Sequence, residues 1–94
     1  MRGKLTEAIK VKSKELLGYE ITQIELRLMP YVQYVMMNAR CIDLARVNED
    51  DEIILTKWHR EGRIDDPGGT LKISKQFWDA LSELCYMAYV VYDQ

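Results

Sequence analysis

One histidine and two cysteines are the residues of this sequence best suited to bind a metal ion or to act as a nucleophile. A zinc site needs about four ligands with a recognisable spacing, which Cys41, His59 and Cys85 do not show. Both cysteines fall in apolar patterns with helical spacing, which is typical of small buried side chains rather than of a disulfide or a reactive thiolate. His59 precedes the expected end of a helix, where a partly charged imidazole interacts favourably with the helix dipole. We therefore expect no metal, no cofactor and no catalytic residue.

Two acidic segments, residues 49–52 and 65–66, carry the carboxylates that a cation site needs. They lack the alternating oxygen ligands and the central glycine of a calcium-binding loop. The first segment follows Asn48, a good helix N-cap, and negative charge in a first helical turn is favourable in itself. Gly68 and Gly69 lack the strand and the Lys-Ser/Thr pair that surround a phosphate-binding loop. No enzyme class is indicated, and we expect a non-enzymatic protein.

Residues 54–73 contain a candidate nucleic-acid site. The segment ILTKWHREGRI (54–64) is followed by a turn, by LKI (71–73) and by a further helical pattern. This order resembles the recognition helix and the wing of winged-helix proteins. The resemblance implies a dimeric transcriptional regulator whose DNA contacts come from Lys57, Arg60 and Arg63, with help from the basic first helix. The charges disfavour DNA as a partner, because four acids open the expected recognition helix and Asp65 and Asp66 occupy the expected wing tip.

The tyrosines form two groups with helical spacing. Tyrosine suits subunit interfaces because it buries a large ring while its hydroxyl stays in water. Methionines at positions 29, 36, 37 and 87 accompany the two groups, and methionine adapts well to contact surfaces. Residue 92 continues the second group. We expect a homodimer interface that includes Tyr31, Tyr34, Val35, Tyr86 and Tyr89.

The composition fits one globular domain over residues 1–94. Hydrophobic residues make up 48% of the chain and charged residues 30%, which is far from the composition of a disordered protein. The net charge of −2 gives no general attraction to nucleic acid or to an anionic membrane. The N-terminal residues are charged and no apolar run approaches the length of a membrane span. We expect a reduced, cytoplasmic protein.

The first half of the chain predicts two helices that position these groups. The first runs from about residue 4 to 17 with Leu5, Ile9, Lys12 and Leu16 on one stripe, Ala8 and Val11 beside it, and Gly18 as its end. The second begins at a capping box of Thr22 and Glu25, with Ile21 and Leu26 as a hydrophobic staple. Its pattern continues to about residue 47, and Pro30 predicts a kink or a break near residues 27–29.

The second half predicts two further helices joined by a turn. Asn48 caps the third helix, Gly62 ends it, and Ile53, Ile54, Leu55 and Trp58 supply its buried side. Residues 66–69 fit a type II turn, and residues 63–64 and 71–73 are able to pair across it. Ser74 caps a last helix from residue 75 to about 92, whose apolar positions are Phe77, Leu81, Leu84, Cys85, Ala88 and Val91.

The sequence thus predicts a mainly α fold, a small bundle of about four helices with a possible short β-ribbon between the last two. The segments TKWHREGRI and KQFWDALSELCYMAYVVYD give the chain a resemblance to small accessory proteins of tailed phages and prophages. This resemblance implies a bacterial cytoplasm and a host or phage protein as a partner. The leading hypothesis is a helical interaction protein that self-associates through the second and last helices, because the apolar surface exceeds what one small core easily buries.

Overall fold

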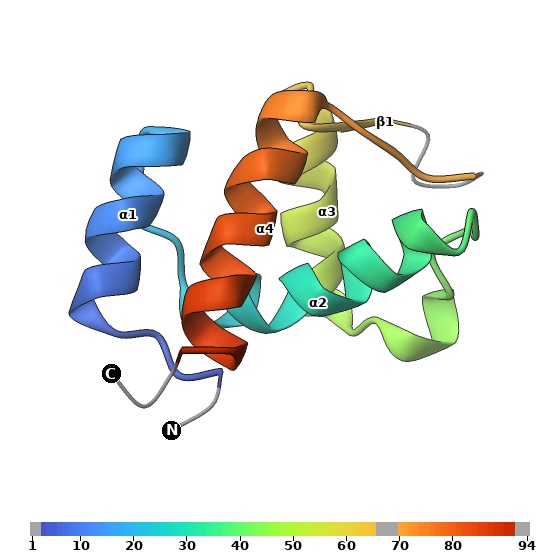
Figure 1. The fold of residues 1–94 in the computed structure, drawn as a ribbon. Coiled ribbons are helices and arrows are strands. Elements are labelled where there is room, and N and C mark those ends of the chain that lie inside the picture. Colours follow the sequence, from blue (N-terminus) through green and yellow to red (C-terminus); the bar gives the residue numbers. More distant parts are fainter. Residues whose placement is uncertain (1–2, 66–69, 92–94) are drawn as a thin grey trace.

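A computed structural model describes residues 3–65 and 70–91, and it confirms the predicted mainly helical fold with a hairpin between the last two helices. Figure 1 shows the arrangement of these elements. In chain order they are α1 (Glu7–Leu17), α2 (Gln23–Met37), a 3-10 helix (Leu44–Arg46), α3 (Glu49–Arg60), β1 (Ile64–Asp65), β2 (Lys72–Ile73) and α4 (Lys75–Tyr89).

Helix α1 begins after its Thr6 cap, later than the expected residue 4, and it ends at Gly18 as predicted. The Thr6 side chain accepts a hydrogen bond from the Ile9 backbone, and Gly18 adopts a φ of 88° that favours glycine. The predicted stripe is confirmed at Ile9, which is buried, and at Leu5 and Leu16, which pack against the core. The helix is nevertheless rotated from the prediction, because Ser13 and Leu17 are buried while Val11 is 61% exposed. The Ser13 hydroxyl fixes this rotation, since it donates to the Lys10 carbonyl at 2.8 Å and accepts from the Ile21 N–H at 3.1 Å.

Helix α2 begins at the predicted capping box, in which the Thr22 side chain and the Glu25 side chain each accept from the other residue's backbone N–H. Pro30 lies inside α2 and does not break it. The helix ends at Met37, however, and not near residue 47. Asn38 caps the end, and its Nδ2 donates to the Tyr34 carbonyl at 2.8 Å. Ala39 then has a φ of 50°, which takes the chain out of the helical path.

The segment after α2 joins the hairpin instead of extending the helix. β1 and β2 pair antiparallel, with Ile64 opposite Ile73. Cys41 forms an antiparallel bridge with Thr70, and the Leu71 N–H donates to the Arg40 carbonyl at 3.2 Å. Cys41 is therefore exposed on an extended segment, and its predicted helical setting is wrong. The predicted type II turn lies outside the described residues.

Helix α3 carries the second capping box of the fold. The Asp51 N–H donates to Asn48 Oδ1 at 2.9 Å, and the Asn48 N–H donates to Asp51 Oδ2 at 3.2 Å. The chain leaves the helix at Gly62, which has a φ of 76°. Ile54, Leu55 and Trp58 face the core as predicted, whereas Ile53 is exposed.

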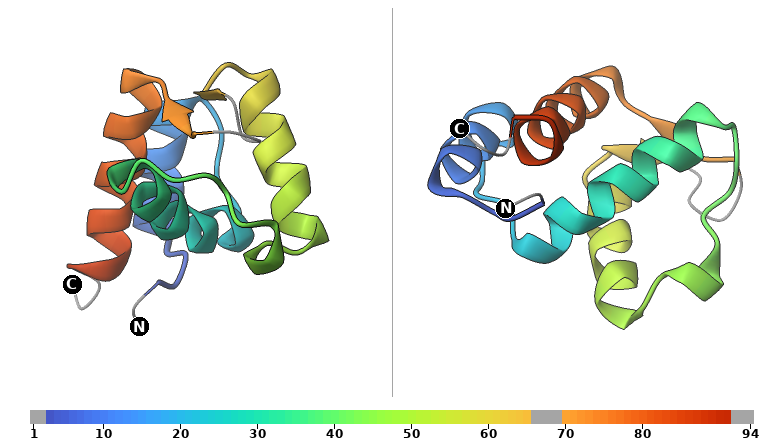
Figure 2. Two further views of the ribbon diagram at one scale, coloured as in Figure 1. Left: turned by 90° about the vertical axis from the view of Figure 1, so that its right-hand side faces the viewer. Right: turned by 60° about the horizontal axis from the view of Figure 1, so that its bottom comes forward.

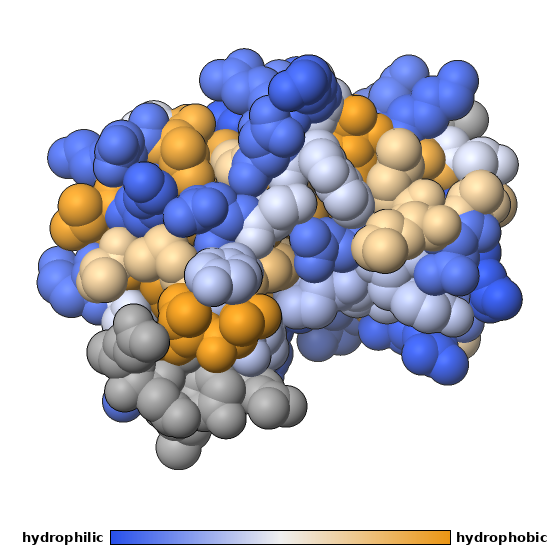
Figure 3. All heavy atoms as spheres, in the orientation of Figure 1, coloured by the Kyte–Doolittle hydropathy of each residue, from blue (hydrophilic) through white to orange (hydrophobic). Residues whose placement is uncertain are grey.

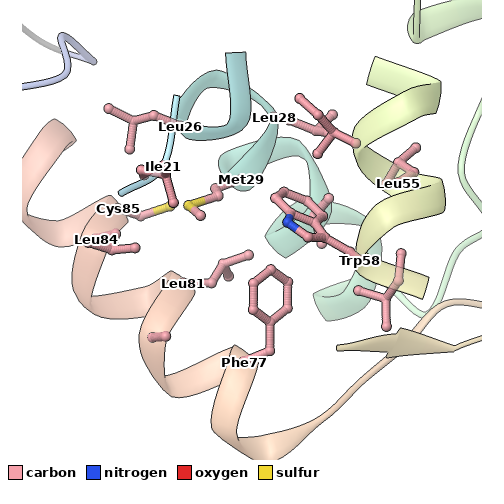
Figure 4. Packing of buried hydrophobic residues seen from close by; sticks show 14 of the residues in the cluster. Ile21, Leu26, Leu28, Met29, Leu55, Trp58, Phe77, Leu81, Leu84 and Cys85 are labelled. Carbon is pink, nitrogen blue, oxygen red and sulfur yellow. The ribbon is translucent and has the colours of Figure 1, made fainter. Parts of the chain in front are cut away.

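Helix α4 is the centre of the fold and packs against both α1 and α2 (Figures 1 and 2). Ser74 caps it as predicted, and it ends at Tyr89, earlier than the expected residue 92. Its buried positions include Phe77, Leu81, Leu84, Cys85 and Ala88. Figure 4 shows Trp58 of α3 pointing between α2 and α4 toward Phe77, and their ring centroids lie 5.0 Å apart.

Candidate functional site

A shallow groove of about 300 Å³ runs between the exposed faces of α2 and α4. We call it the α2/α4 groove, and it is lined by Pro30, Gln33, Ser82, Cys85, Tyr86, Tyr89 and Val90. Gln33 Nε2 donates to Ser82 Oγ at 3.3 Å and joins the two helices at its floor. In Figure 3 apolar residues gather over the lower end of α4 and over the right-hand part of α2, with hydrophilic residues between them.

The predicted interface residues divide into three groups. Tyr34 and Tyr86 are exposed, and Tyr89 lines the groove while being partly buried. Tyr31 is half-buried, and its hydroxyl accepts from the Asp43 N–H at 2.8 Å, so it holds the chain after α2. Val35 is only 1% exposed and belongs to the core, so it does not lie on this surface. Helical spacing alone assigned Val35 to the wrong face, because neighbouring positions of an apolar helix look alike in sequence.

Val90 lines the groove and escaped the predicted interface set, whereas Met37 was expected to accompany the tyrosines and lies at the end of α2, outside the groove lining. Met37 and Val90 are large hydrophobic residues, 74% and 62% exposed. Pro30, Tyr34 and Met37 share the spacing of one helical face, and Tyr86 and Val90 are four residues apart on α4. These spacings were the available signal, but only the packing of α2 on α4 shows which face stays open to solvent.

The groove contains two groups whose ionisation is suppressed. Burial raises the pKa of the Cys85 thiol to about 12, so the thiol is protonated at neutral pH and unreactive. Burial also raises the pKa of the Tyr89 hydroxyl above its ordinary value, with a further contribution from Cys85 and an opposing one from Arg27. Neither group is suited to nucleophilic chemistry, and both suit a contact surface.

The predicted DNA contacts do not act as one basic surface. Arg60 is exposed on α3. Lys57 Nζ lies 3.8 Å from the centroid of the Tyr19 ring and 3.7 Å from the buried Glu25 carboxylate. The Arg63 side chain is only 19% exposed; its Nη2 donates to the Leu17 carbonyl and its Nε to the Glu61 carboxylate, both at 3.0 Å. Arg63 is therefore engaged inside the fold, and Lys57 is partly engaged there, with 41% of its side chain exposed.

Glu25 is the centre of a buried polar cluster that the sequence indicated only as a helix cap. Glu25 is 2% exposed, and its carboxylate accepts from the Tyr19 hydroxyl as well as from the Thr22 N–H and hydroxyl. Trp58 Nε1 donates to the same Tyr19 hydroxyl at 3.3 Å. Desolvation, followed by the hydrogen bond to Glu25, raises the pKa of Tyr19 well above its ordinary range. Every fully buried polar side-chain atom of the cluster has a hydrogen-bond partner. The cluster therefore has a structural role and holds α2 and α3 together.

The remaining chemistry-bearing residues stay apart. Cys41 and Cys85 are free thiols, one exposed and one buried. His59 Nε2 lies 3.9 Å from Asp65 Oδ1 near the end of α3, which fits its predicted dipole role. Among residues 3–65 and 70–91, no group of three or more His, Cys, Asp or Glu side chains is arranged to hold a metal ion.

Comparison of the chain with protein-family models, with curated proteins and with solved structures finds no match. Over the described residues, the helices are too short or too polar for any of them to cross a membrane. Function therefore has to be argued from the surfaces themselves.

Proposed function

We propose that this chain is a small, non-enzymatic helical interaction protein that self-associates through the α2/α4 groove. The observation that carries the proposal is the exposure of two large hydrophobic side chains that line the groove, Tyr86 at 52% and Val90 at 62%. Tyr34 and Met37 of α2 are also exposed, at 48% and 74%, but do not line the groove. Exposed apolar side chains gathered along a groove often mark a binding site in a soluble protein.

The chemistry of the groove supports a protein as the occupant. Aromatic residues and methionine are enriched at protein interfaces, and charged residues are depleted at their centres. The groove is lined by tyrosine, valine, proline and uncharged polar side chains, with no charged side chain among them. A second copy is the simplest partner because most oligomers of small proteins are symmetric and use the same patch twice.

The test replaces Tyr86 by Lys and measures molar mass by size-exclusion chromatography with light scattering. The matched control is Val11→Lys, which also places a charge on an exposed apolar residue, 61% exposed on α1 and outside the groove. We expect the wild type and the control to elute as the same oligomer and Tyr86→Lys to shift toward the 11.1 kDa monomer. Equal molar masses for all three proteins would refute the assignment of the interface.

The setting of this function follows from the whole-chain resemblance to accessory proteins of phages and prophages. A bacterial cytoplasm and a host or phage protein as a further partner belong to the proposal on that ground. Copurification of a bacterial protein with the wild type, and its loss with Tyr86→Lys but not with Val11→Lys, would support the same surface for that partner.

A winged-helix-like DNA-binding regulator is the second candidate. One observation favours it: the Cys41–Thr70 bridge adds a third extended segment to the hairpin that follows α3. The order of α3, hairpin and α4 is the one that carries the winged-helix resemblance in the sequence. The engagement of Arg63 within the fold and the four acids at the start of α3 argue against it, since phosphate contacts need exposed cations.

DNA binding is tested by fluorescence anisotropy with random-sequence duplex DNA at about 50 mM and about 200 mM salt, over which phosphate contacts weaken steeply. Micromolar binding that collapses with salt and is lost in Arg60→Glu would favour the regulator. The interaction proposal predicts no binding at the lower salt concentration.

A further inference from the structure

Helix α3 has an exposed face that the α2/α4 groove does not use. Six residues line one shallow depression along its whole length: Glu49, Glu52, Ile53, Thr56, Lys57 and Arg60. Their spacing of three, four, seven, eight and eleven residues from the first is that of a single helical stripe. Ile53, in the middle, is 62% exposed. An isoleucine this exposed between charged residues is the pattern of a small apolar centre with a charged rim.

The charges on this face are ordered along the helix. Glu49 and Glu52 occupy its N-terminal half, and Lys57 and Arg60 occupy its C-terminal half. Within the part of the chain that the structure describes, the side chains of Glu49, Glu52 and Arg60 make no hydrogen bond or ion pair. Three of the four charges are thus available to an external partner.

The order of the charges makes the face complementary to itself. When two copies of α3 lie antiparallel, Glu49 faces Arg60 of the other copy and Glu52 faces its Lys57. Ile53 then meets Thr56 of the other copy. The two residues of every pair lie at equal distances in sequence from the point between residues 54 and 55, where the twofold axis crosses the helices. A parallel arrangement would place like charges together, so only the antiparallel one is favourable.

We propose that the exposed face of α3 binds the same face of a second copy of this chain, with the two helices antiparallel. Each twofold contact then contains the Glu49–Arg60 pair twice and the Glu52–Lys57 pair twice around an Ile53–Thr56 centre. Lys57 keeps its place over Tyr19, since its side chain is 41% exposed and an ammonium group has three donors.

This contact is distinct from the α2/α4 groove and does not depend on it. A single helix face falls at the small end of specific interfaces, so the contact is weak by itself and sensitive to salt. Combined with a twofold contact at the α2/α4 groove, it joins dimers into tetramers or longer assemblies.

The test is a charge exchange, made in a Tyr86→Lys background so that the groove does not contribute. Glu49→Arg and Arg60→Glu are each examined alone by sedimentation velocity, and the two proteins are then mixed in equal amounts and examined in the same way. The measurements are made at low salt and at protein concentrations up to about 1 mM, so that weak association is detected. The matched control is Asp50→Arg, which makes the same charge change at an exposed neighbouring position outside the depression.

We expect the Tyr86→Lys protein and its Asp50→Arg derivative to self-associate equally. Glu49→Arg and Arg60→Glu should each weaken association at least tenfold, because each places like charges opposite each other at two positions. The equal mixture should recover association, since both pairs then have opposite charges again. A Tyr86→Lys protein that is still monomeric at about 1 mM, equal losses for Glu49→Arg and Asp50→Arg, or no recovery in the mixture would each overturn the proposal.

Discussion

Replacing Glu25 by Ala should destabilise the fold far more than the loss of one surface charge. Glu25 is 2% exposed, and its carboxylate caps α2 by accepting from the Thr22 N–H at 3.1 Å. It also accepts from the Tyr19 hydroxyl, which Trp58 Nε1 contacts from the other side. Removal of the carboxylate therefore breaks the helix cap and leaves a half-buried hydroxyl without its acceptor.

The magnitude follows from these separate losses. Loss of a capping interaction costs about 1 kcal/mol. A buried donor that loses its acceptor costs about 1–3 kcal/mol. The ion pair with Lys57 adds little, because the lysine side chain is 41% exposed and water screens the attraction. The sum is about 3 kcal/mol, which for a domain of this size lowers the melting temperature by roughly 15 °C.

The assay is urea denaturation followed by circular dichroism for Glu25→Ala, Glu25→Gln and the control Glu20→Ala. Glu20 is an exposed neighbour, so its replacement should change the free energy of unfolding by less than about 0.5 kcal/mol. Glu25→Gln keeps an oxygen that is able to accept from Thr22 and should cost about 1 kcal/mol. The reasoning fails if Glu25→Ala is as mild as Glu20→Ala.

Three further predictions concern thiols, alkaline pH and a helix end. Iodoacetamide at neutral pH should alkylate the exposed Cys41 and leave Cys85 intact until the protein unfolds, as mass spectrometry would show; equal labelling rates would contradict the burial of Cys85. The pKa of Cys85 in the folded protein, about 12, lies above the pKa of a thiol in the unfolded chain. The contribution of Cys85 to the free energy of unfolding is therefore complete at neutral pH and is lost as the pH rises from about 9 toward 12. Urea titrations should show a smaller alkaline loss for Cys85→Ala, and an unchanged loss would count against this linkage. Gly18→Ala should cost about 1 kcal/mol because of the positive φ at residue 18 and not because of crowding, so Gly18→Asn, which tolerates that φ better, should cost less in the same titrations.

Local signals in the sequence predicted the starts of α2, α3 and α4 correctly, whereas α1 begins about three residues later than expected. The caps at Thr22, Asn48 and Ser74 depend on hydrogen bonds that span three residues, so sequence alone specifies them. The ends of α1 and α3 were predictable for an equally local reason. Gly18 and Gly62 follow these helices and adopt a positive φ, which glycine does without strain.

Tertiary contacts decided what the sequence did not. The end of α2 depends on Ala39, a residue that favours helices but adopts a positive φ where Cys41 joins the hairpin. The rotation of α1 depends on Ser13, a polar residue buried by its hydrogen bond to Ile21, eight positions away. Val35 was assigned to the interface although it is buried in the core. The sequence of a helix that is apolar on almost every side does not reveal which face the neighbouring helix covers.

The most direct measurement of the central claim is a dilution series of amide NMR spectra from about 1 mM to about 10 µM, a range that covers weak and moderate self-association. Self-association through the α2/α4 groove predicts concentration-dependent shifts at Gln33, Tyr86, Tyr89 and Val90, and none along the exposed side of α1. Spectra that do not change with concentration, or shifts that leave these four residues unaffected, would contradict it.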